Sequence, residues 1–553
     1  MTISRSTIKA QPQRGEISQP SATHWGTATK FAQPQRGEIA NSRFRPFRAV
    51  ARIIGIPSAT HWAVALRSLG AKPKLAVFFV ILVCIVALTA STSAQRRGPQ
   101  APAYNYPPQL LEEMKQLQQA ALSNEYALKQ VAYLCNNIGP RLSGSPQAAR
   151  AVEYVADEMR KLGLEVRLEK VMVPHWVRGV ETGELTQFPG MAAGTTQKVV
   201  LTALGGSVAT PAAGITAPVV VVNNFNELTA LGEAKVKGKI VLFNFKFDEQ
   251  LAAQGFGGDA YGQAVAYRGG GAIAAARLGA VAALNRSAGG KAYRLPHTGA
   301  LGYADGVTKI PGAAVAGEDA EMIAHLAAQG EVKLKLVLTP QTLPDAESAN
   351  VIADLKGSEF PDQVIIVSGH LDSWDLGTGA IDDASGVAVA MQVANLCKQL
   401  GLKPKRTIRV IAWINEENGT RGGQTYFQNQ KDNLANHIAA IESDLGAGHP
   451  TGFSAFVKPA AVPMLQPIAN LLLSSGAGLL RISDGPVEAD ISPLQRAGVP
   501  GFAPIQDNRT YFDYHHTPAD TFDKVVPREL AENAAVMAVL AYAIANLPEP
   551  LPR

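Results

Sequence analysis

The sequence predicts an α/β protein: a mostly parallel, twisted sheet with helices on both faces, into which a β-rich domain is inserted. Strand-like and helix-like segments alternate over residues 346–553, a pattern typical of parallel sheets covered on both faces. Amphipathic helical segments occupy residues 109–164, and short β-rich runs fill residues 196–344 between these two parts. With 553 residues, the chain is long enough for two or three domains.

The first part of the large domain, residues 108–195, begins with helices. The segments LLEEMKQLQQAAL and AARAVEYVADEMRKLG carry apolar residues three and four positions apart, and Gly163 ends the second helix. The turn-forming segment IGPRLSGSP lies between them. The alternating segment LEVRLEKVMV, residues 164–173, predicts the first strand.

The inserted domain, residues 196–344, is predicted from a shift in composition. Gly- and Ala-rich segments separate its short β-rich runs, which are KVVLTAL, APVVVVNN, GKIVLFNF, GAVAALN, IPGAAVAG and VKLKLVL. Few of its residues have catalytic side chains in a suggestive spacing. We therefore expect a separate domain of about 150 residues that divides the large domain without carrying its chemistry.

The second part of the large domain, residues 345–553, alternates strands and helices. Its predicted strands are QVIIVSGH (363–370), RTIRVIAWINEE (406–417) and HIAAIESDL (437–445). A predicted helix over 385–401 ends at Gly401, and GGQTYFQNQ begins another. In sheets of this kind, the binding crevice lies beyond the carboxyl ends of the strands.

Charge is unevenly distributed along the chain. Residues 1–74 hold 12 Lys or Arg and 2 Asp or Glu, a net charge of +10, whereas the remainder holds 39 basic and 44 acidic residues, a net charge of −5. Because most of the chain is mildly acidic, we expect no nucleic-acid partner, whose binding depends on basic contacts to phosphates. The content of 46% hydrophobic and 18% charged residues also excludes a disordered chain.

The basic front end predicts export. The apolar run of residues 75–90 follows Lys72 and Lys74 and precedes the small residues 91–94, which is typical of a secretory signal peptide over 75–94. We expect cleavage after about Ala94, a periplasmic or extracellular location, and no stable membrane insertion of the mature chain. An uncleaved membrane anchor is the alternative. Only Cys135 and Cys397 lie beyond the signal, so at most one disulfide is expected.

Residues 1–74 form a repeat-containing leader. QPQRGEI occurs at 11–17 and 33–39, and PSATHW occurs at 20–25 and 57–62. A signal peptide does not normally begin 70 residues into a chain, so we expect this leader to be disordered or to extend the reading frame beyond a true start near residue 70. A repeat-based binding arm is the functional alternative.

Polar side chains follow three strands of the second part at the point where each strand ends. His370 and Asp372 follow VIIVSG, Glu416 and Glu417 follow RVIAWIN, and Asp444 follows AAIES. Because the carboxyl ends of parallel strands meet at one edge of the sheet, we expect these side chains to lie together.

Asp382 and Asp383 in GAIDDASG, with His516 in YHHTPADTFD, complete the candidate set. Each residue alone has an ordinary explanation; Asp383, for example, could cap the following helix. Together, the imidazoles and carboxylates would repel one another in one crevice unless a cation neutralised them. The mixture suits zinc or another divalent first-row metal, such as cobalt or manganese, and the number of groups suits two ions sharing a carboxylate.

These motifs resemble those of the co-catalytic zinc peptidases of the aminopeptidase S and glutamate carboxypeptidase group. The segments that carry the resemblance are HLDSWDLGTGAIDDASG, INEENGTRGG, ESDLGAG and YHHTPADTFDKV, in the order of the family. The resemblance extends over residues 108–553, including IGPRLSGSP, and the insertion is similar to a protease-associated domain. It implies an exopeptidase with two Zn²⁺ ions that acts on small peptides, with dipeptides as the expected substrates.

The resemblance also implies a role for each residue. Five residues would bind the metal, with Asp382 shared by both ions: His370, Asp444, Asp382, Glu417 and His516. His515 is the competing choice for His516, which the family marks by an acid four residues later, here Asp520. Asp372 would hydrogen-bond the imidazole of His370 through its carboxylate, and a cis peptide would precede Asp383.

Glu416 matches the general base of the family. Two cations would lower the pKa of a bridging water, so that hydroxide attacks the scissile carbonyl while Glu416 takes the proton and returns it to the leaving amine. The choice between carboxypeptidase and aminopeptidase stays open. Candidates for recognition of the substrate ends near the motifs are Arg421, Arg481, Arg509 and Tyr511.

Other classes of protein remain as alternatives. A metal-free peptidase-like binding protein would show a damaged ligand set, whereas all five ligands and the base are present. In a second alternative, the insertion recruits a partner and hydrolysis is secondary. One-lobed di-zinc deacylases lack the DASG context, and some relatives cyclise N-terminal glutamine instead of hydrolysing peptides. A homodimer is also left open.

Overall fold

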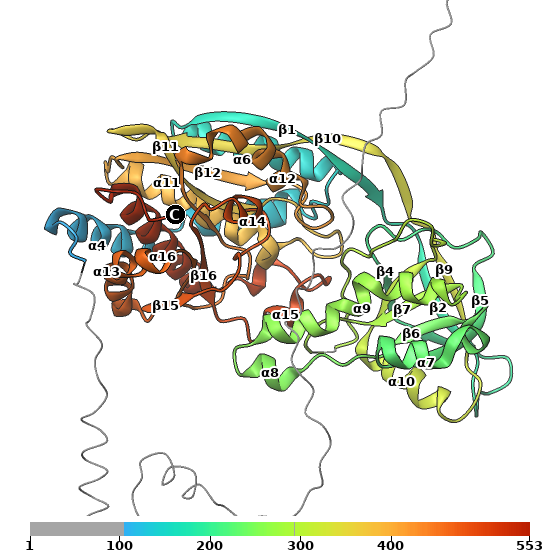
Figure 1. The fold of residues 1–553 in the computed structure, drawn as a ribbon. Helices are drawn as coiled ribbons and strands as arrows, with labels where there is room; N and C mark the ends of the chain where they lie inside the picture. Colours follow the sequence, from blue (N-terminus) through green and yellow to red (C-terminus); the bar gives the residue numbers. More distant parts are fainter. Residues whose placement is uncertain (1–103, 292) are drawn as a thin grey trace, which may run out of the picture. The chain divides into compact units, whose positions relative to one another are not determined.

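The computed structural model describes residues 104–291 and 293–553, which belong to one unit, Tyr104–Arg553 (Figure 1). The expected leader at 1–74 and the expected signal peptide at 75–94 lie outside the described residues, so both remain predictions. Among the described helices, none combines the length and the apolar character needed to cross a membrane.

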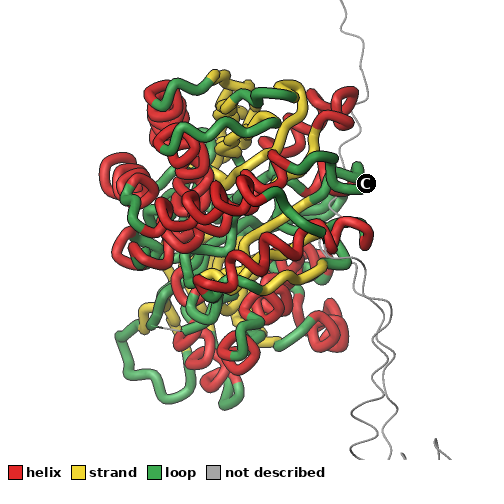
Figure 2. Tube along the Cα trace, turned by 90° about the vertical axis from the view of Figure 1, so that its left-hand side faces the viewer, coloured by secondary structure: helices red, strands yellow, loops and turns green. Residues whose placement is uncertain are grey.

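Two eight-stranded sheets organise these residues (Figures 1 and 2). The first sheet has the order β1-β10-β12-β11-β13-β16-β14-β15. Its strands are β1 (Glu165–Val177), β10 (Gln341–Leu355), β11 (Phe360–His370), β12 (Arg406–Trp413), β13 (His437–Glu442), β14 (Pro450–Phe456), β15 (Leu479–Ile482) and β16 (Gly501–Gln506).

The centre of the first sheet is parallel, as predicted. Strands β12, β11, β13 and β16 are neighbours that all run in one direction. Strands β1, β10 and β14 join this centre through antiparallel pairs. The sheet is therefore mixed at its edges, while the four strands that lead to the predicted polar residues have the expected geometry.

The helices beside the first sheet come from both ends of the described chain. They are α4 (Pro108–Leu122), α5 (Tyr126–Tyr133), α6 (Pro146–Lys161), α11 (Ser385–Gln399), α12 (Arg421–Gln430), α13 (Val462–Leu472), α14 (Ser492–Arg496), α15 (Tyr511–Tyr514) and α16 (Pro527–Asn546). Helix α6 begins at Pro146, two residues before the predicted segment, because the side chain of Ser145 caps it by accepting a hydrogen bond from Ala148 N at 3.1 Å.

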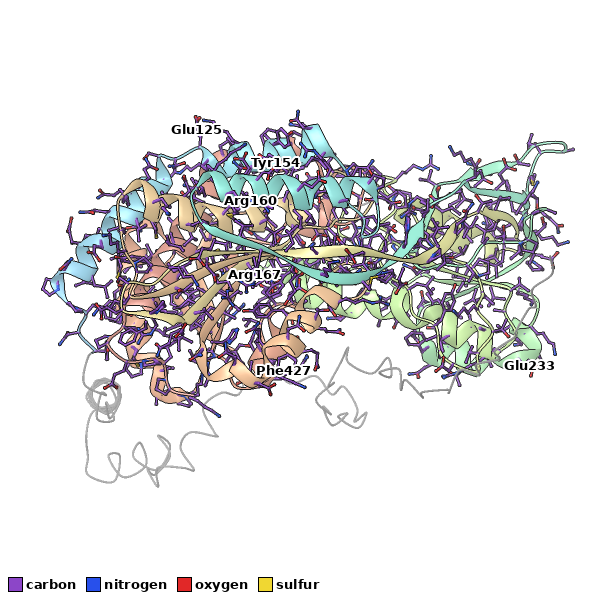
Figure 3. All side chains as sticks on the ribbon, turned by 90° about the horizontal axis from the view of Figure 1, so that it is seen from above. Glu125, Tyr154, Arg160, Arg167, Glu233 and Phe427 are labelled. Atoms are coloured by element: carbon purple, nitrogen blue, oxygen red, sulfur yellow. The ribbon has the colours of Figure 1, made fainter. Side chains whose placement is uncertain are left out.

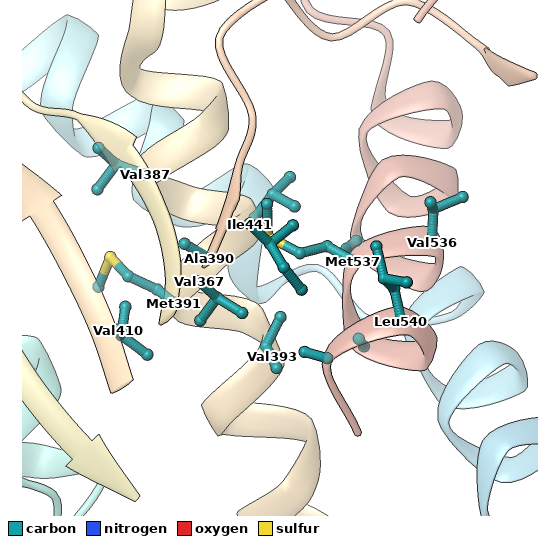
Figure 4. Packing of buried hydrophobic residues seen from close by; sticks show 14 of the residues in the cluster. Val367, Val387, Ala390, Met391, Val393, Val410, Ile441, Val536, Met537 and Leu540 are labelled. Carbon is teal, nitrogen blue, oxygen red and sulfur yellow. The ribbon is translucent and has the colours of Figure 1, made fainter. Parts of the chain in front are cut away.

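Helices cover both faces of this sheet, so its central strands are apolar on both sides. On one face, Val367, Val410 and Ile441 of three parallel strands pack in the same cluster as residues of α11 and α16 (Figure 4). On the other face, Trp413 packs with Tyr426 of α12. Figure 3 shows α6, which carries the labelled Tyr154 and Arg160, lying along strand β1.

The second sheet is formed by the residues between β1 and β10, in the order β3-β2-β9-β5-β6-β7-β8-β4. Its strands are β2 (Glu181–Gln187), β3 (Gln197–Val199), β4 (Leu201–Ala203), β5 (Ile215–Val222), β6 (Ile240–Phe243), β7 (Ala282–Arg286), β8 (Gly312–Val315) and β9 (Lys333–Leu338). Its helices are α7 (Phe225–Val236), α8 (Glu249–Ala253), α9 (Gly257–Arg277) and α10 (Gly317–Ala327).

These residues coincide largely with the expected insertion, and the insertion and its boundaries remain a proposal. Strand β2 already pairs in the second sheet, upstream of the expected start at residue 196. Helix α9, with 21 residues, was not anticipated, because its glycines lower helix propensity. Packing explains one of them: a Cβ on Gly271 would lie 2.9 Å from the ring of Phe243, so glycine lets the helix approach the sheet.

Candidate metal centre

The carboxyl ends of the four parallel strands supply the predicted polar residues. His370 is the last residue of β11 and pairs with Trp413, the last residue of β12. Glu416 and Glu417 follow Trp413 by three and four residues. Asp444 comes two residues after β13, and His516 comes two residues after α15, which follows β16. The expectation that these residues share one edge of the sheet agrees with the structure.

Asp382 lies between two imidazoles. Its Oδ1 is 3.1 Å from Nε2 of His370, and its Oδ2 is 3.1 Å from Nε2 of His516. Each imidazole also meets a second carboxylate: His370 Nε2 is 3.1 Å from Asp444 Oδ1, and His516 Nε2 is 3.0 Å from Glu417 Oε2. The structure thus brings together all five expected ligands in two groups that share Asp382.

The donor atoms fit a zinc ion. Two ligands bound tetrahedrally at 2.0–2.1 Å are separated by roughly 3.3 Å, close to the spacing of these nitrogen and oxygen atoms. In addition, Asp382 Oδ2 is buried, and its 3.1 Å contact with His516 Nε2 lacks hydrogen-bond geometry, so it has no hydrogen-bond partner among the described residues. A buried carboxylate oxygen without a partner is costly, and a cation would satisfy it.

The electrostatics of the cluster also call for positive charge. Burial lowers the pKa of His370, but Asp444 and Asp382 together raise it well above its usual value. Burial likewise lowers the pKa of His516, and Glu417 and Asp382 raise it to about 9. Around Asp382, the three nearby imidazoles outweigh burial and hold the pKa well below its usual value. The carboxylates therefore attract cations, and bound metal would take the place of protons.

His515 lies beside the group without the same contacts. Its Nε2 is 3.4 Å from Asp382 Oδ2, and its ring stacks on His516 with the centroids 3.6 Å apart. Asp382, His515 and His516 could themselves hold an ion. Because only His516 also contacts Glu417, the geometry supports His516 as the ligand over His515.

Asp372 does not contact His370 as expected. Nδ1 of His370 lies 2.9 Å from the main-chain oxygen of Asp372 and 3.9 Å from its carboxylate. The carboxylate instead accepts hydrogen bonds from Ser143 Oγ at 2.9 Å and from Glu416 N at 3.1 Å. These two donors turn the carboxylate away from the imidazole, so the main-chain oxygen is the partner that fixes the tautomer of His370.

Asp383 and Asp520 support the backbone around Asp382. The peptide bond between Asp382 and Asp383 is cis, as expected. Asp383 accepts hydrogen bonds from His370 N at 3.0 Å and from Gly386 N at 2.9 Å. Asp520 Oδ1 accepts from the main-chain N–H groups of residues 380 and 381, and burial raises the pKa of its carboxyl to about 7.

The sequence alone did not assign Arg141 and Trp374 to the site. Arg141 is fully buried and donates to the main-chain oxygens of Leu371 at 2.8 Å and Gly379 at 2.9 Å, on both sides of the loop that leads to Asp382. Its place in the turn segment IGPRLSGSP was the available signal. The main-chain N–H of Trp374 donates to Glu417 Oε1 at 3.2 Å.

One of the four candidates for substrate recognition lies at the centre. The hydroxyl of Tyr511 donates to the main-chain oxygen of Asp444 at 3.4 Å. The other three have partners elsewhere: Arg421 pairs with Asp345, Arg509 with Asp507, and Arg481 donates to Ser454 Oγ. Arg421 is therefore explained as a surface ion pair.

The mixed α/β sheet with its parallel centre, the buried cluster of imidazoles and carboxylates at its carboxyl edge, and the similarity to known proteins together identify a zinc-type metallo-exopeptidase. The chain belongs to Peptidase family M28, whose sequence profile matches residues 350–541. This confirms the group to which the sequence motifs pointed.

The motifs also predict a likeness to carboxypeptidase Q and its bacterial relatives, and the comparisons confirm it. The chain is 39% identical to carboxypeptidase Q of Bos taurus over 428 residues, covering 77% of this chain and 86% of the relative. It is 39% identical to that of Homo sapiens over 435 residues, with the same coverage.

Two solved structures are similar in fold. A Peptidase M28 precursor from Shewanella amazonensis superposes with a TM-score of 0.76 and 37% identity, covering 80% of this chain and 98% of that chain. An aminopeptidase from Aneurinibacillus sp. strain AM-1 superposes with a TM-score of 0.55 and 22% identity, covering 79% of this chain and 97% of that chain. The second likeness concerns the fold alone.

Proposed function

We propose that this chain is an exported exopeptidase with two zinc ions that hydrolyses small peptides, with dipeptides as its substrates. The observation that carries the proposal is the position of Asp382, whose two carboxylate oxygens face two separate imidazole–carboxylate pairs. His370 and Asp444 would hold one ion, and His516 and Glu417 the other. A receptor that had lost its metals would not keep both pairs.

Glu416 is the proposed general base. It follows the carboxyl end of β12 and belongs to neither of the two imidazole–carboxylate pairs. Its main-chain N–H donates a hydrogen bond to the carboxylate of Asp372. When bound, zinc lowers the pKa of water and polarises the scissile carbonyl. Glu416 takes a proton from the attacking water as its oxygen joins the carbonyl carbon. It gives that proton to the amine nitrogen as the peptide C–N bond breaks.

Burial helps Glu416 to carry the proton between these steps. Burial, followed by the nearby charge of Asp444, raises the pKa of Glu416 well above its usual value. A carboxyl whose protonated form is stabilised accepts a proton readily and returns it to a more basic amine. Bound cations would lower the pKa of Glu416, so that in the metal-bound site this pKa would lie closer to its usual value.

Both ends of a dipeptide would find complementary groups in the described residues. A cavity of about 90 Å³ beside the second sheet is lined by the basic side chains of Lys246, Arg286 and Lys291, together with Glu249 and with His297, whose pKa burial lowers to about 3. It adjoins the segment that leads to His516, since Gly290 N donates to Phe512 O at 2.8 Å. This cavity suits a substrate carboxylate.

The opposite end has an acidic candidate. Glu488 has a left-handed backbone conformation (φ 56°), and burial and the charge of Asp444 raise its pKa to about 8. A free amino group of the substrate would stabilise the ionised form of this side chain. An aminopeptidase that acts on longer peptides would use Glu488 and leave the basic cavity without a role.

A panel of dipeptides with free, N-acetylated or C-amidated ends tests the proposal. We expect hydrolysis of the free dipeptide, its loss after treatment with a chelator, and its return on addition of zinc. A loss of activity on the amide favours recognition of the carboxylate, and a loss on the acetylated peptide favours recognition of the amine. If zinc-loaded protein cleaves none of the panel, the proposed function is wrong.

Export is a separate proposal that rests on the sequence of residues 75–94. Expression in a bacterium with a secretion pathway, followed by N-terminal sequencing of the mature protein, tests it. We expect the mature chain to begin near Gln95. A mature protein that keeps residues 75–94 would favour the membrane anchor.

A further inference from the structure

The residues of the insertion reach His516 through a loop between β7 and β8. Thr298, which is fully buried, donates its main-chain N–H to the main-chain oxygen of His516 at 2.9 Å. The main-chain oxygen of Thr298 lies 3.2 Å from Nδ1 of the same histidine. Thr298 therefore contacts both the backbone and the imidazole of His516.

Arg268 of helix α9 reaches the same point. Its Nη1 lies 3.2 Å from the oxygen of Thr298 and 3.3 Å from Nδ1 of His516. A guanidinium can only donate hydrogen bonds. When Nδ1 of His516 carries a proton and cannot accept, Nη1 of Arg268 therefore donates to the oxygen of Thr298. The absence of a side chain at Gly299 leaves room for the guanidinium, since a Cβ there would lie 2.3 Å from its central carbon.

This arrangement selects one tautomer of His516. A histidine that binds metal through Nε2 carries its proton on Nδ1 and needs an acceptor for it. The oxygen of Thr298 is that acceptor. His516 also has a left-handed backbone (φ 61°), which a residue with a side chain adopts only when its surroundings hold it. The main-chain bond from Thr298 supplies such support.

A second chain of contacts leads from Thr298 to the other ligand of the same ion. Arg178 donates to Thr298 Oγ1 at 3.2 Å and binds the carboxylate of Asp375 through two hydrogen bonds of 2.8 and 2.6 Å. Asp375 follows Trp374, whose main-chain N–H donates to Glu417. His516 and Glu417 are the two ligands that would bind this ion alone. Both thus depend on contacts with residues beside or within the second sheet.

We propose that the insertion is a structural part of the metal centre, with Thr298 and Arg268 as positioning residues for His516. The proposal rests on the proposed function in one respect, namely that His516 binds an ion. On this proposal, the insertion is not merely a module that recruits a partner. The ion held by His516 and Glu417 depends on the insertion, whereas the ion held by His370 and Asp444 does not.

Zinc affinity of Arg268 variants tests the proposal. Arg268→Met keeps the length of the side chain and removes its donors, and Arg268→Lys restores a single donor to the oxygen of Thr298. Arg277→Met is the matched control, because Arg277 lies exposed in the last turn of the same helix. Elemental analysis after dialysis against zinc buffers of graded free concentration gives the number and affinity of the ions.

We expect Arg268→Met to bind one of its two ions about 10–100-fold more weakly than the unchanged protein, the loss typical of outer contacts to a metal ligand. Arg268→Lys should bind with intermediate affinity, and Arg277→Met should match the unchanged protein. Activity of Arg268→Met should return as free zinc is raised, which a loss of fold would not allow.

A folded Arg268→Met variant that binds both ions with unchanged affinity overturns the proposal. If that variant does not fold, Arg268→Lys answers the same question, because it keeps one donor and the length of the side chain. A second ion bound more weakly than in the unchanged protein supports the proposal, and two ions of unchanged affinity in a folded Arg268→Lys variant overturn it. If the unchanged protein binds no zinc, the proposed function itself fails, which is a distinct result.

Discussion

The carboxylate of Asp372 accepts a hydrogen bond from the main-chain N–H of Glu416 at 3.1 Å, while the main-chain oxygen of Asp372 lies 2.9 Å from Nδ1 of His370. One residue therefore supports the proposed base through its side chain and a proposed ligand through its backbone. Because a substitution changes only the side chain, the two roles can be separated by experiment.

Asp372→Asn should slow turnover and leave metal binding intact. The amide keeps the shape of the side chain but weakens the hydrogen bonds from Ser143 and Glu416, so the base loses its fixed position. We expect kcat to fall about 10–100-fold, as for other contacts that support a site. Elemental analysis should give the zinc content of the unchanged protein. A variant that loses zinc would show that the carboxylate, and not the main-chain oxygen, supports His370.

Glu416→Gln should abolish catalysis while zinc stays bound. The amide cannot accept the proton of water, and a general base contributes about 10²–10⁴-fold to the rate. Steady-state kinetics on the best dipeptide measures the loss, and elemental analysis measures the metal. Glu417→Gln is the matched control, because the neighbouring position is a proposed ligand and its variant should lose metal as well as activity. Retained activity in Glu416→Gln would refute the assignment of the base.

His370→Ala and His516→Ala should each lose bound zinc, whereas His515→Ala should keep it. The first two imidazoles contact two carboxylates each at 3.0–3.1 Å, and His515 contacts Asp382 alone at 3.4 Å. The comparison uses metal content after dialysis at one free zinc concentration. If His515→Ala loses zinc and His516→Ala does not, the assignment of the two adjacent histidines must be exchanged.

Removal of metal should destabilise the fold. Without a cation, the carboxylates of Asp382, Asp444 and Glu417 lie in one cluster, where the imidazoles of His370 and His516 are their nearest partners. A ligand present at 1,000 times its Kd stabilises a native protein by about 4 kcal/mol. We therefore expect a chelator to lower Tm by several degrees and zinc to restore it. Equal Tm values with and without chelator would argue against a bound metal.

Stability should fall as the pH drops from about 6.5 to about 4 through His437. This side chain is buried in β13, with Nε2 2.9 Å from the hydroxyl of Tyr426, and burial lowers its pKa to about 4. The unfolded chain, with a pKa near 6.5, binds a proton in this range before the native state does. Stability is therefore full above the unfolded pKa and decreases by up to about 1.4 kcal/mol per pH unit below it.

Urea unfolding between pH 4.5 and 7 measures this dependence. The unchanged protein is compared with His437→Gln. A chelator present throughout keeps both free of metal, so that protonation of the metal ligands contributes equally to the two slopes. His437→Gln should show a smaller slope than the unchanged protein. Equal slopes would mean that His437 is protonated to the same extent in both states.

The sequence predicted the positions of the candidate site residues best where those residues directly follow a strand. Runs such as QVIIVSG predicted β11, and the polar residue after each run lies at the expected edge, because the carboxyl ends of parallel strands converge. Asp382 and His516 do not directly follow a strand; the sequence singled them out within polar motifs, and the family resemblance gave them their roles as ligands. The hydrogen bond from Nδ1 of His370 to a main-chain oxygen was not predictable, since sequence patterns describe side chains and every residue has the same acceptor.

Thr298 and Arg268 were beyond prediction for a different reason. They contact His516 from 218 and 248 residues away in the sequence, and only the packing of the insertion against the metal-binding loop brings them there. Helix α9, which carries Arg268, was missed because its glycines suggested loops between strands. Its formation depends on tertiary contacts, which override weak helix propensity.

Helix α4, near the start of the described chain, packs against α16, near its end, where Tyr542 donates to Glu113 at 2.8 Å. Strand β1 likewise finds its partner only in β10, where Glu165 pairs with Asp354. The apolar side of α4 can be buried against α16 only after residues 527–546 have been synthesised. The first sheet and its helices therefore complete their fold late, whereas all strands of the second sheet are available once residue 338 has been made.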